Sequence, residues 1–586
     1  MIKKRIAFLA CFIMLLLVLL AARLVQIQLI STESFSAHHV NLIEASVKQR
    51  TQTVTLDDGR GKFYDVKGVP LAHEEVPTLV LFPFLKKMDW PADKVAGIIG
   101  RDEEALKNAV QMAKEPFAFG GKKPIILTDE QTAAINSLKV PGVFAVKEKF
   151  NQNSIPAAQL IGSTVMYGSL KVPRYPDQKL SAQTRVGYRG LQRTFDEFLL
   201  SGGDSKLVYH VDANGGPMFG VDVKYVEPAN PLYPVKVITT LNKGLQEKAE
   251  KLVDEHGIKK GGIVLIDIAS SEIRAIVSRP SMEKRNPDAE GSVNLMFRQA
   301  APGSVFKTVV AAAAIDYQAA KNKTFNCSLT IEGKKDKKHD YGPLNFENSF
   351  AQSCNRAFAE LGQEITAKNP DFLKQYAEKL NVIGGSGWKG NVYHTPIEQL
   401  DQEDKGKIWQ DEKLKKDPRM VAKSSIGQQD VQATPLAIAN MMATIARGGE
   451  KEMVKAVKKV EFNNGTSIVS FPDMKISGKP ISPYTALKLQ QMLRGVVTSP
   501  KGTGAPLADL PYEVAGKSGT AQTDIERKRL NKWFAGYFPY KNPKYALVAV
   551  SLDTDEKSET MTPLFGDIVK EVYKEDQKQV NDGTKE

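Results

Sequence analysis

The chain has 586 residues, a hydrophobic content of 42% and a formal net charge of +13. These values exclude global disorder and a single small domain, and they predict two or three folded units. The charge suits nucleic acid, an anionic membrane surface or an acidic wall polymer, but zinc-finger spacing, RNP-like stretches and dense basic arms are missing, so nucleic acid is not expected as a partner. A solvated basic surface is the simplest interpretation of the dispersed lysines.

The cysteine and histidine content gives no sign of a metal site or a cofactor. The three cysteines are Cys11, Cys327 and Cys354, and the seven histidines form no ligand-like cluster apart from the adjacent His38 and His39, which are interpreted as exposed polar residues. Cys327 and Cys354 could pair, but the sequence alone does not show it.

The first thirty residues predict a membrane anchor. Lys3, Lys4 and Arg5 precede an apolar run over 6–22, and apolar character continues past Arg23. A cleaved signal peptide is the alternative, but Ala22 is followed by Arg23 and no clear A-x-A site is present. We expect an uncleaved single-pass anchor over 1–30, with the N-terminus cytoplasmic and the remainder extracytoplasmic.

Residues 31–235 are expected to form a first extracytoplasmic domain of short strands and helices. Strand-like runs occur near residues 78 and 123, the stretch 129–140 is typical of a helix, and 188–203 is expected to be helical up to its two glycines.

The pattern changes at residue 236, and 236–576 is expected to form a second domain. An amphipathic helix over 242–257 precedes two strands, over 262–268 and 272–278, which are joined by a hairpin turn. Apolar helices are predicted over 304–316, 356–365, 434–447 and 483–497, followed by strands over 513–523, 532–539 and 545–553 and a helix over 562–575. This order predicts an α+β domain with an antiparallel sheet, and the charged end, 577–586, is expected to be disordered.

Ser304 and Lys307 are the first candidates for chemistry. Residues three apart share a helix face, and a lysine in an apolar helix bundle loses charge by desolvation, so the pair can act as nucleophile and base. An N-cap serine with a snorkelling lysine is the structural alternative. Ser-x-x-Lys also occurs at 281–284 and 386–389, but both of those stretches are loop-like.

Two further motifs strengthen the first. Ser353 and Asn355 form Ser-x-Asn 49 residues after Ser304, and the run Lys517-Ser518-Gly519-Thr520 begins 164 residues after Ser353. A helix cap and an edge-strand lysine with a bulge glycine are the structural alternatives for each motif taken alone. The ordered set resembles the motif triplet of penicillin-binding proteins and serine β-lactamases.

The remainder of the chain resembles monofunctional, class B penicillin-binding proteins of a Gram-positive, Bacillus type. The supporting stretches are RGKFYDVKGVPLA (60–72), GLQRTFDEFLLSG (190–202) and ARLVQIQ (22–28). Gln192 stands where the family usually has Glu, which puts one contact of the N-terminal domain in doubt. A preceding glycosyltransferase region and appended PASTA-type modules are not expected.

The resemblance implies a penicillin-binding transpeptidase domain, with a five-stranded antiparallel sheet and helices on both sides, behind an elongated pedestal domain. It implies a peptidoglycan D,D-transpeptidase in which Ser304 attacks the bond between two D-alanines of a stem peptide and Lys307 accepts the proton. Ser353 and Lys517 would relay a proton and Asn355 would bind the substrate amide. Ser518, Gly519 and Thr520 would form the substrate-binding segment, in which Ser518 and Thr520 bind the terminal carboxylate beside Lys517. The N–H groups of Ser304 and Thr520 would form an oxyanion hole.

Cys354, inside Ser-x-Asn, is interpreted as a small packed residue and not a nucleophile. The expected partners are peptidoglycan stem peptides, β-lactam antibiotics and a membrane glycosyltransferase. The alternatives are a D,D-carboxypeptidase or β-lactamase with the same site, and a non-catalytic scaffold or β-lactam sensor of the wall-synthesis complex. The lifetime of the acyl-enzyme, and the phenotype of a Ser304→Ala variant, would distinguish them.

Overall fold

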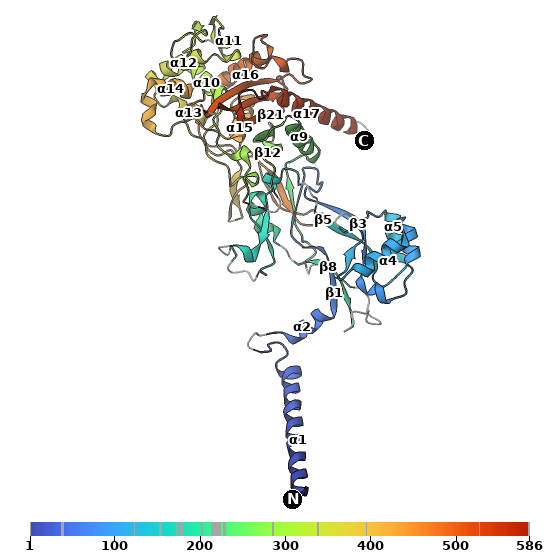
Figure 1. Ribbon diagram of the computed structural model, residues 1–586. Coiled ribbons are helices and arrows are strands. Elements are labelled where there is room, and N and C mark those ends of the chain that lie inside the picture. The colour runs from blue at the N-terminus through green and yellow to red at the C-terminus, as the bar shows by residue number, and fades with distance from the viewer. Residues whose placement is uncertain are drawn as a thin grey trace. The chain divides into compact units, whose positions relative to one another are not determined.

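A computed structural model places an isolated apolar helix at the start of the chain (Figure 1). The structure describes residues 2–583 except 37–39, 122–123, 152–154, 171–173, 176–179, 201–202, 213–223, 227–229, 284–285, 287, 337–338, 394, 525 and 527. Helix α1 (Ile2–Val25) continues into a π-helical turn (Gln26–Ile30), and none of its residues is buried. Together these 29 residues are long and apolar enough to cross a membrane.

The folded part divides into two compact units that do not follow a single cut in the sequence. The first unit comprises residues 1–59, 73–151 and 201–231, and the second comprises 60–72, 152–200 and 232–586. The insertion 60–72 joins the second unit because strand β2 (Lys62–Tyr64) pairs in parallel with β10 (Lys236–Thr239).

Besides α1 and the short helix α2 (Leu42–Gln49), the described part of the first unit contains two small antiparallel sheets and three further helices. One sheet has the order β1 (Thr51–Asp57), β8 (Ser205–His210) and β9 (Lys224–Val226), and the other has the order β4 (Phe117–Ala118), β3 (His73–Leu81) and β5 (Val143–Asn151). The helices are α3 (Ala92–Ile99), α4 (Glu103–Met112) and α5 (Asp129–Ser137). The side chain of Thr128 caps α5 in a capping box with Gln131, which explains the helix predicted from 129. The strand-like run near 123 lies partly outside the described residues, and in its described part Ile126 forms an isolated bridge with Thr78.

The second unit is built on a five-stranded antiparallel sheet. Its strand order is β12 (Glu272–Arg279), β11 (Gly261–Asp267), β21 (Tyr545–Asp555), β20 (Arg529–Phe538) and β19 (Ala515–Asp524). The sequence order of two strands, several helices, three strands and a final helix is therefore as predicted. The strand that carries Lys517 lies at the edge of the sheet, with one side unpaired in the sheet.

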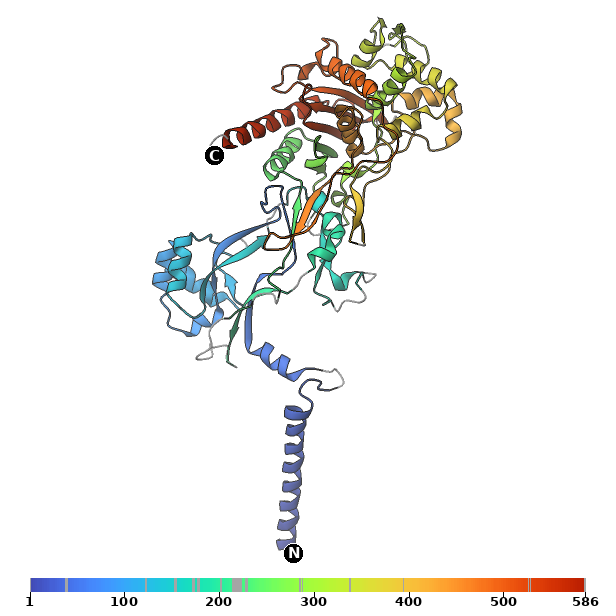
Figure 2. The ribbon, with the colours of Figure 1, turned by 180° about the vertical axis from the view of Figure 1, so that it is seen from behind.

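Both faces of this sheet are covered by helices, which explains its nearly continuous apolar strands. Ile263 and Leu265 pack with α9 (Lys243–Glu255) and α17 (Thr562–Gly583), whereas Val264 and Ile266 face α15 (Pro435–Ala446). Figures 1 and 2 show these layers from two sides. Each fully buried aliphatic side chain contributes about 1.5–3 kcal/mol, so the two-sided burial makes this sheet the core of the unit. The predicted α+β fold is confirmed.

The remaining helices gather beyond one face of the sheet (Figure 1). They are α10 (Lys307–Asp316), α11 (Phe346–Ala351), α12 (Asn355–Lys368), α13 (Phe372–Lys379), α14 (Pro418–Ser425) and α16 (Pro483–Thr498). Most begin at a side-chain cap; for example, Ser482 caps α16, with Pro483 as its first residue. The helices predicted from 304, 356, 434 and 483 are confirmed to within a few residues.

Two expectations about the helices need correction. The stretch 188–203 is not one helix, because Phe195 leaves the helical region between α7 (Gly190–Thr194) and α8 (Asp196–Leu199). The final helix does not stop near 575 but runs to Gly583, so the predicted disordered tail is helical as far as the structure describes it. Asp576 holds the extension, since it accepts hydrogen bonds from the hydroxyls of Tyr512 and Tyr545 at 2.7 and 2.8 Å.

The Gln192 contact that the sequence put in doubt is made. Arg60 donates to Gln192 Oε1 at 2.8 Å and to Asp196 Oδ1 at 2.7 Å. Asp196 is buried and also accepts from Tyr175 and Arg174. The carboxamide of Gln192 therefore serves as the acceptor that a carboxylate would provide, while Asp196 supplies the charge.

Candidate active site

The turn that carries Ser304 is pressed against the edge strand of the sheet. Residues 303–306 form a 3₁₀ turn that leads into α10. Gly303 has φ +54°, and a Cβ there would lie 2.3 Å from the carbonyl oxygen of Thr520. A Cβ on Gly519 would lie 2.6 Å from the carbonyl oxygen of Pro302. Both glycines are therefore required by close backbone approach, which brings Ser304 beside the Lys-Ser-Gly-Thr segment.

Two hydrogen bonds fix the chain just before Ser304. The indole N–H of Trp533 donates to the carbonyl of Ala301 at 3.0 Å, and the N–H of Gly303 donates to the carbonyl of Gly427 at 3.0 Å. Trp533 is buried on the neighbouring strand β20, so the position of the turn is set by the sheet.

Lys307 lies fully buried at the first turn of α10, where the remaining side chains up to Ala314 are apolar or small. Its ammonium donates to the Ser353 carbonyl at 2.7 Å, to Ser353 Oγ at 3.1 Å and to Asn355 Oδ1 at 2.7 Å. The Ser-x-Asn segment therefore supplies the acceptors for the three hydrogen bonds of this buried ammonium group.

Lys517 approaches the same hydroxyl from the sheet. It is also fully buried and donates to Ser353 Oγ at 2.9 Å and to the carbonyl of Ser518 at 3.0 Å. The hydroxyl of Ser353 thus lies between two lysine nitrogens that come from different elements. A hydroxyl both accepts and donates, so this arrangement can pass a proton from one amine to the other.

Burial shifts the protonation of both lysines. Desolvation lowers the pKa of Lys517 to about 7. Desolvation, reinforced by repulsion from Lys517, holds the pKa of Lys307 well below its usual range. Two ammonium groups that share one hydroxyl in a dry site repel each other, so one amine is readily neutral and available as a base.

A disulfide holds the Ser-x-Asn segment in place. Cys354 is bonded to Cys327, with the two Cα atoms 5.7 Å apart. Cys354 is buried, as expected of a packed residue, but it is a bonded cystine and not a free thiol. Its sulfur also caps α12 through the N–H of Ala357. Ser353 itself has φ +60°, a left-handed conformation that is uncommon for a residue other than glycine and that turns the chain sharply at the site.

The predicted motifs meet at one cleft of ≈ 630 Å³. Its lining includes members of all three motifs, namely Ser304, Ser353, Asn355, Ser518, Gly519 and Thr520. Lys307 and Lys517 lie beneath it, bound to Ser353. The structure thus brings together the residues of the three motifs.

Sequence reasoning missed other residues of the cleft. Gln428 lines it and bridges to β19, with its amide donating to the Thr520 carbonyl at 3.3 Å and its oxygen accepting from the Gln522 N–H at 3.2 Å. The Ser518 hydroxyl donates to Thr503 Oγ1 at 2.7 Å. His339 and Tyr341 also line the cleft. These side chains come from separate loops, and no local pattern marks them.

The other two Ser-x-x-Lys matches are not part of the cleft. Ser386 is buried and accepts a hydrogen bond from Asn381 Nδ2 at 3.1 Å, and Lys389 begins the hairpin of β15 (Lys389–Val392) and β16 (Thr395–Glu398). Ser281 lies in a loop, and its partner Lys284 is outside the described residues.

Comparisons with known proteins agree with this geometry. Residues 261–570, more than half of the chain, match the penicillin-binding protein transpeptidase domain, and residues 56–233 match the penicillin-binding protein dimerisation domain. The chain therefore belongs to the penicillin-binding proteins that carry a transpeptidase domain.

Similar individual proteins indicate which class of penicillin-binding protein the chain resembles. The chain is 27% identical over 362 residues to the peptidoglycan D,D-transpeptidase PbpA of Mycobacterium tuberculosis, covering 55% of this chain and 69% of that protein. It is 22% identical over 606 residues to stage V sporulation protein D of Bacillus subtilis, covering 97% and 85%. A solved structure of a peptidoglycan synthase complex contains a chain with a TM-score of 0.63 and 23% identity, covering 96% of this chain and 97% of that one. These matches confirm the resemblance to class B penicillin-binding proteins.

Proposed function

We propose that this protein is a peptidoglycan D,D-transpeptidase that works through an acyl-enzyme on Ser304. The observation that carries the proposal is the Ser353 hydroxyl held at 3.1 Å from Lys307 and 2.9 Å from Lys517 beside the cleft that Ser304 lines. A serine nucleophile, a desolvated amine and a hydroxyl relay are the parts that acyl transfer needs.

In the first half-reaction, Ser304 Oγ bonds to the carbonyl carbon of the penultimate D-alanine, and its proton passes to the neutral amine of Lys307. The C–N bond to the terminal D-alanine then breaks. Its leaving nitrogen takes a proton by way of the Ser353 hydroxyl, which lies in hydrogen-bond contact with both lysines. D-Alanine leaves, and the acyl group stays on Ser304.

Other groups of the cleft bind the substrate and the oxyanion during this half-reaction. The backbone N–H groups of Ser304 and Thr520 stabilise the oxyanion, at about 3 kcal/mol for each donor. The close packing of Gly303 and Gly519 sets the spacing of these two segments. Lys517, Ser518 and Thr520 receive the terminal carboxylate, and Asn355 binds the substrate amide.

In the second half-reaction, an amine from a neighbouring stem peptide attacks the acyl carbonyl. It gives up a proton to Lys307, the bond to Ser304 Oγ breaks, and the serine regains its hydrogen. The product is a cross-link between two stem peptides. β-Lactams follow the first half-reaction and remain on Ser304, so the same residues explain inhibition.

The catalytic unit lies outside the cytoplasm, anchored by α1. Two observations support this orientation. Lys3, Lys4 and Arg5 precede the apolar helix, which is typical of a cytoplasmic end. The Cys327–Cys354 disulfide persists in an oxidising compartment and not in the cytosol. A membrane glycosyltransferase that makes the glycan strands is the partner that this reaction requires.

Labelling of the full-length, detergent-solubilised protein with fluorescent penicillin tests the proposal. The wild type should form one long-lived covalent adduct, and peptide mapping should place it on Ser304. Ser304→Ala should abolish labelling, whereas the matched control Ser281→Ala should label like the wild type. Equal labelling of wild type and Ser304→Ala would remove the assigned nucleophile, and rapid release of the adduct would favour a β-lactamase.

A further inference from the structure

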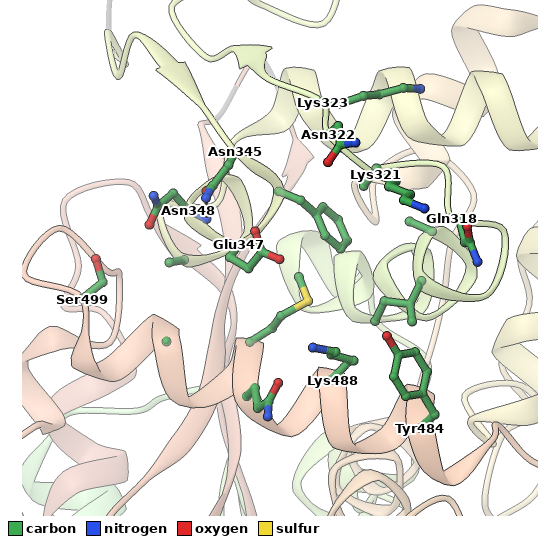
Figure 3. A pocket seen from close by; sticks show the side chains of 18 of the residues that line it. Gln318, Lys321, Asn322, Lys323, Asn345, Glu347, Asn348, Tyr484, Lys488 and Ser499 are labelled. Atoms are coloured by element: carbon green, nitrogen blue, oxygen red, sulfur yellow. Dashed lines mark hydrogen bonds between the residues drawn. The ribbon is translucent and has the colours of Figure 1, made fainter.

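A second cavity, of ≈ 790 Å³, is lined by the C-terminal end of α10, whereas Ser304 of the catalytic cleft precedes the N-terminal end of that helix. It lies between the end of α10, the segment 318–323, α11 and α16. Figure 3 shows Tyr484 and Lys488 of α16 directed toward Glu347 of α11 and toward the loop that carries Lys321. Its volume is within the range of sites that enclose a small organic ligand.

The lining of this cavity combines three kinds of groups. Its apolar surface comes from Ala314, Ile315, Phe346 and Met492, and all of these except Ile315 are buried core side chains. Five carboxamides surround that surface: Gln318, Asn322, Asn345, Asn348 and Gln491. Carboxamides both donate and accept hydrogen bonds, so the lining can match the amide groups of a peptide.

The charges at the cavity favour an anion. Lys321, Lys323 and Lys488 line it against a single carboxylate, Glu347. Lys323 is paired with Glu364, outside the cavity. Within the part of the chain that the structure describes, Lys321 and Lys488 make no ion pair, and the Lys488 ammonium lies 5.9 Å from the ring centroid of Tyr484. Two solvated ammonium groups are thus available to a ligand that carries carboxylates.

We propose that this cavity is a second, non-catalytic binding site for an uncross-linked stem peptide of peptidoglycan. Its carboxamides pair with the peptide amides, Lys321 and Lys488 pair with free carboxylates, and the apolar surface receives alanine methyl groups. The identity of the ligand rests on the proposed function, because a transpeptidase meets this peptide as its substrate. The site is distinct from the cleft, since the two linings have no residue in common.

Gly495 allows the cavity to be closed by design. It lines the cavity within α16, and a Cβ built on it meets no atom within 4 Å. A methyl group at this position therefore meets no clash and leaves most of the space free, and we expect a large side chain to fill the cavity. Gly495→Trp and Gly495→Ala thus form a matched pair.

The test uses the full-length protein in detergent, first acylated with penicillin so that the catalytic cleft is blocked. An uncross-linked disaccharide pentapeptide is then titrated by calorimetry. We expect one equivalent to bind, and the Lys321→Gln/Lys488→Gln variant to bind at least about tenfold more weakly. Gly495→Trp should abolish binding, while Gly495→Ala and the exposed control Lys541→Gln should bind as the wild type does.

The possible results separate this inference from the proposed function. Penicillin labels every one of these variants if the cleft is intact, because none of the substitutions touches it. A labelled wild type that does not bind the muropeptide overturns the second site and leaves the transpeptidase. Undiminished binding by both Gly495→Trp and the double lysine variant also overturns it. A muropeptide with amidated carboxylates should bind at least about fivefold more weakly, and equal binding would contradict the role of the two lysines.

Discussion

The catalytic cleft and the second cavity lie at opposite ends of α10, and both use lysines, yet in opposite ways. Lys307 and Lys517 are fully buried and bonded to one serine hydroxyl, whereas Lys321 and Lys488 are exposed. Burial lowers the pKa of the first pair, which makes an amine that can accept a proton. The second pair keeps its solvent, which makes an attractive charge for an anion. Burial therefore prepares Lys307 to act as a base, whereas Lys321 and Lys488, which keep their hydration, can only offer charge.

Loss of the buried amine should have the largest effect. In Lys307→Gln, a side chain that cannot accept a proton replaces the base, so acylation by penicillin should fall by roughly 10³-fold. Lys321→Gln should change the rate less than about twofold, because a solvated lysine outside the cleft takes no part in proton transfer. Stopped-flow acylation measures both. A Lys307→Gln enzyme that is acylated as fast as the wild type would show that the buried lysine is not the base.

Substitution of a glycine in the cleft should have the second largest effect on acylation. Gly303→Ala places a methyl group 2.3 Å from the Thr520 carbonyl and forces alanine into φ +54°, so the turn must move away from the strand. We expect acylation to fall by about 10- to 100-fold and the free energy of unfolding to drop by about 1–3 kcal/mol. Acylation kinetics and chemical denaturation measure the two effects, and an unchanged rate would show that the contact is not needed.

The pH dependence of the acylation rate should report the protonation of Lys307 and Lys517. Acylation requires Lys307 neutral, so the rate rises as that group loses its proton. It also requires Lys517 charged beside the ligand carboxylate, so the rate falls as pH rises through about 7. The decline should approach about tenfold per pH unit. In Lys517→Arg the charge persists, and the decline should disappear; an unaltered alkaline limb would assign it to another group.

The smallest effect is expected at the second cavity. Gly495→Ala adds a methyl group in open space within a helix, so it should raise the free energy of unfolding by about 0.5–1 kcal/mol. Denaturant titration of the full chain, with penicillin labelling as the control, measures it. A destabilised Gly495→Ala would mean that the space around this glycine is not open, in direct contrast to Gly303.

Much of the fold could be predicted because each signal was local. Strands β11 and β21 are buried on both faces, so they appear in the sequence as unbroken apolar runs. The start of helix α16 can be predicted from Ser482, its N-cap, and Pro483, its first residue. The three motifs could be placed in one site because their order and spacing are typical of a family, not because any one of them is distinctive.

The features that could not be predicted from the sequence depend on contacts between residues that are distant in the chain. A separation of 27 residues does not reveal that Cys327 and Cys354 are bonded, since the pairing depends on how the segment between them folds back. The inclusion of 60–72 in the second unit follows from strand pairing with β10. The charged end of α17 predicts disorder, whereas the contacts of Asp576 with Tyr512 and Tyr545, which are distant in the sequence, hold this part of the helix to the fold.

The cystine closes a covalent ring in the chain from residue 327 to residue 354. Lys334 and Lys335 lie exposed within that ring. A protease that cuts there cannot release either half, because the sulfur–sulfur link still joins them. In denaturing electrophoresis the nicked protein would migrate as one band without a thiol and as two bands after a thiol is added. The fragment that carries Ser353 would thus stay covalently joined to the fragment that carries Cys327.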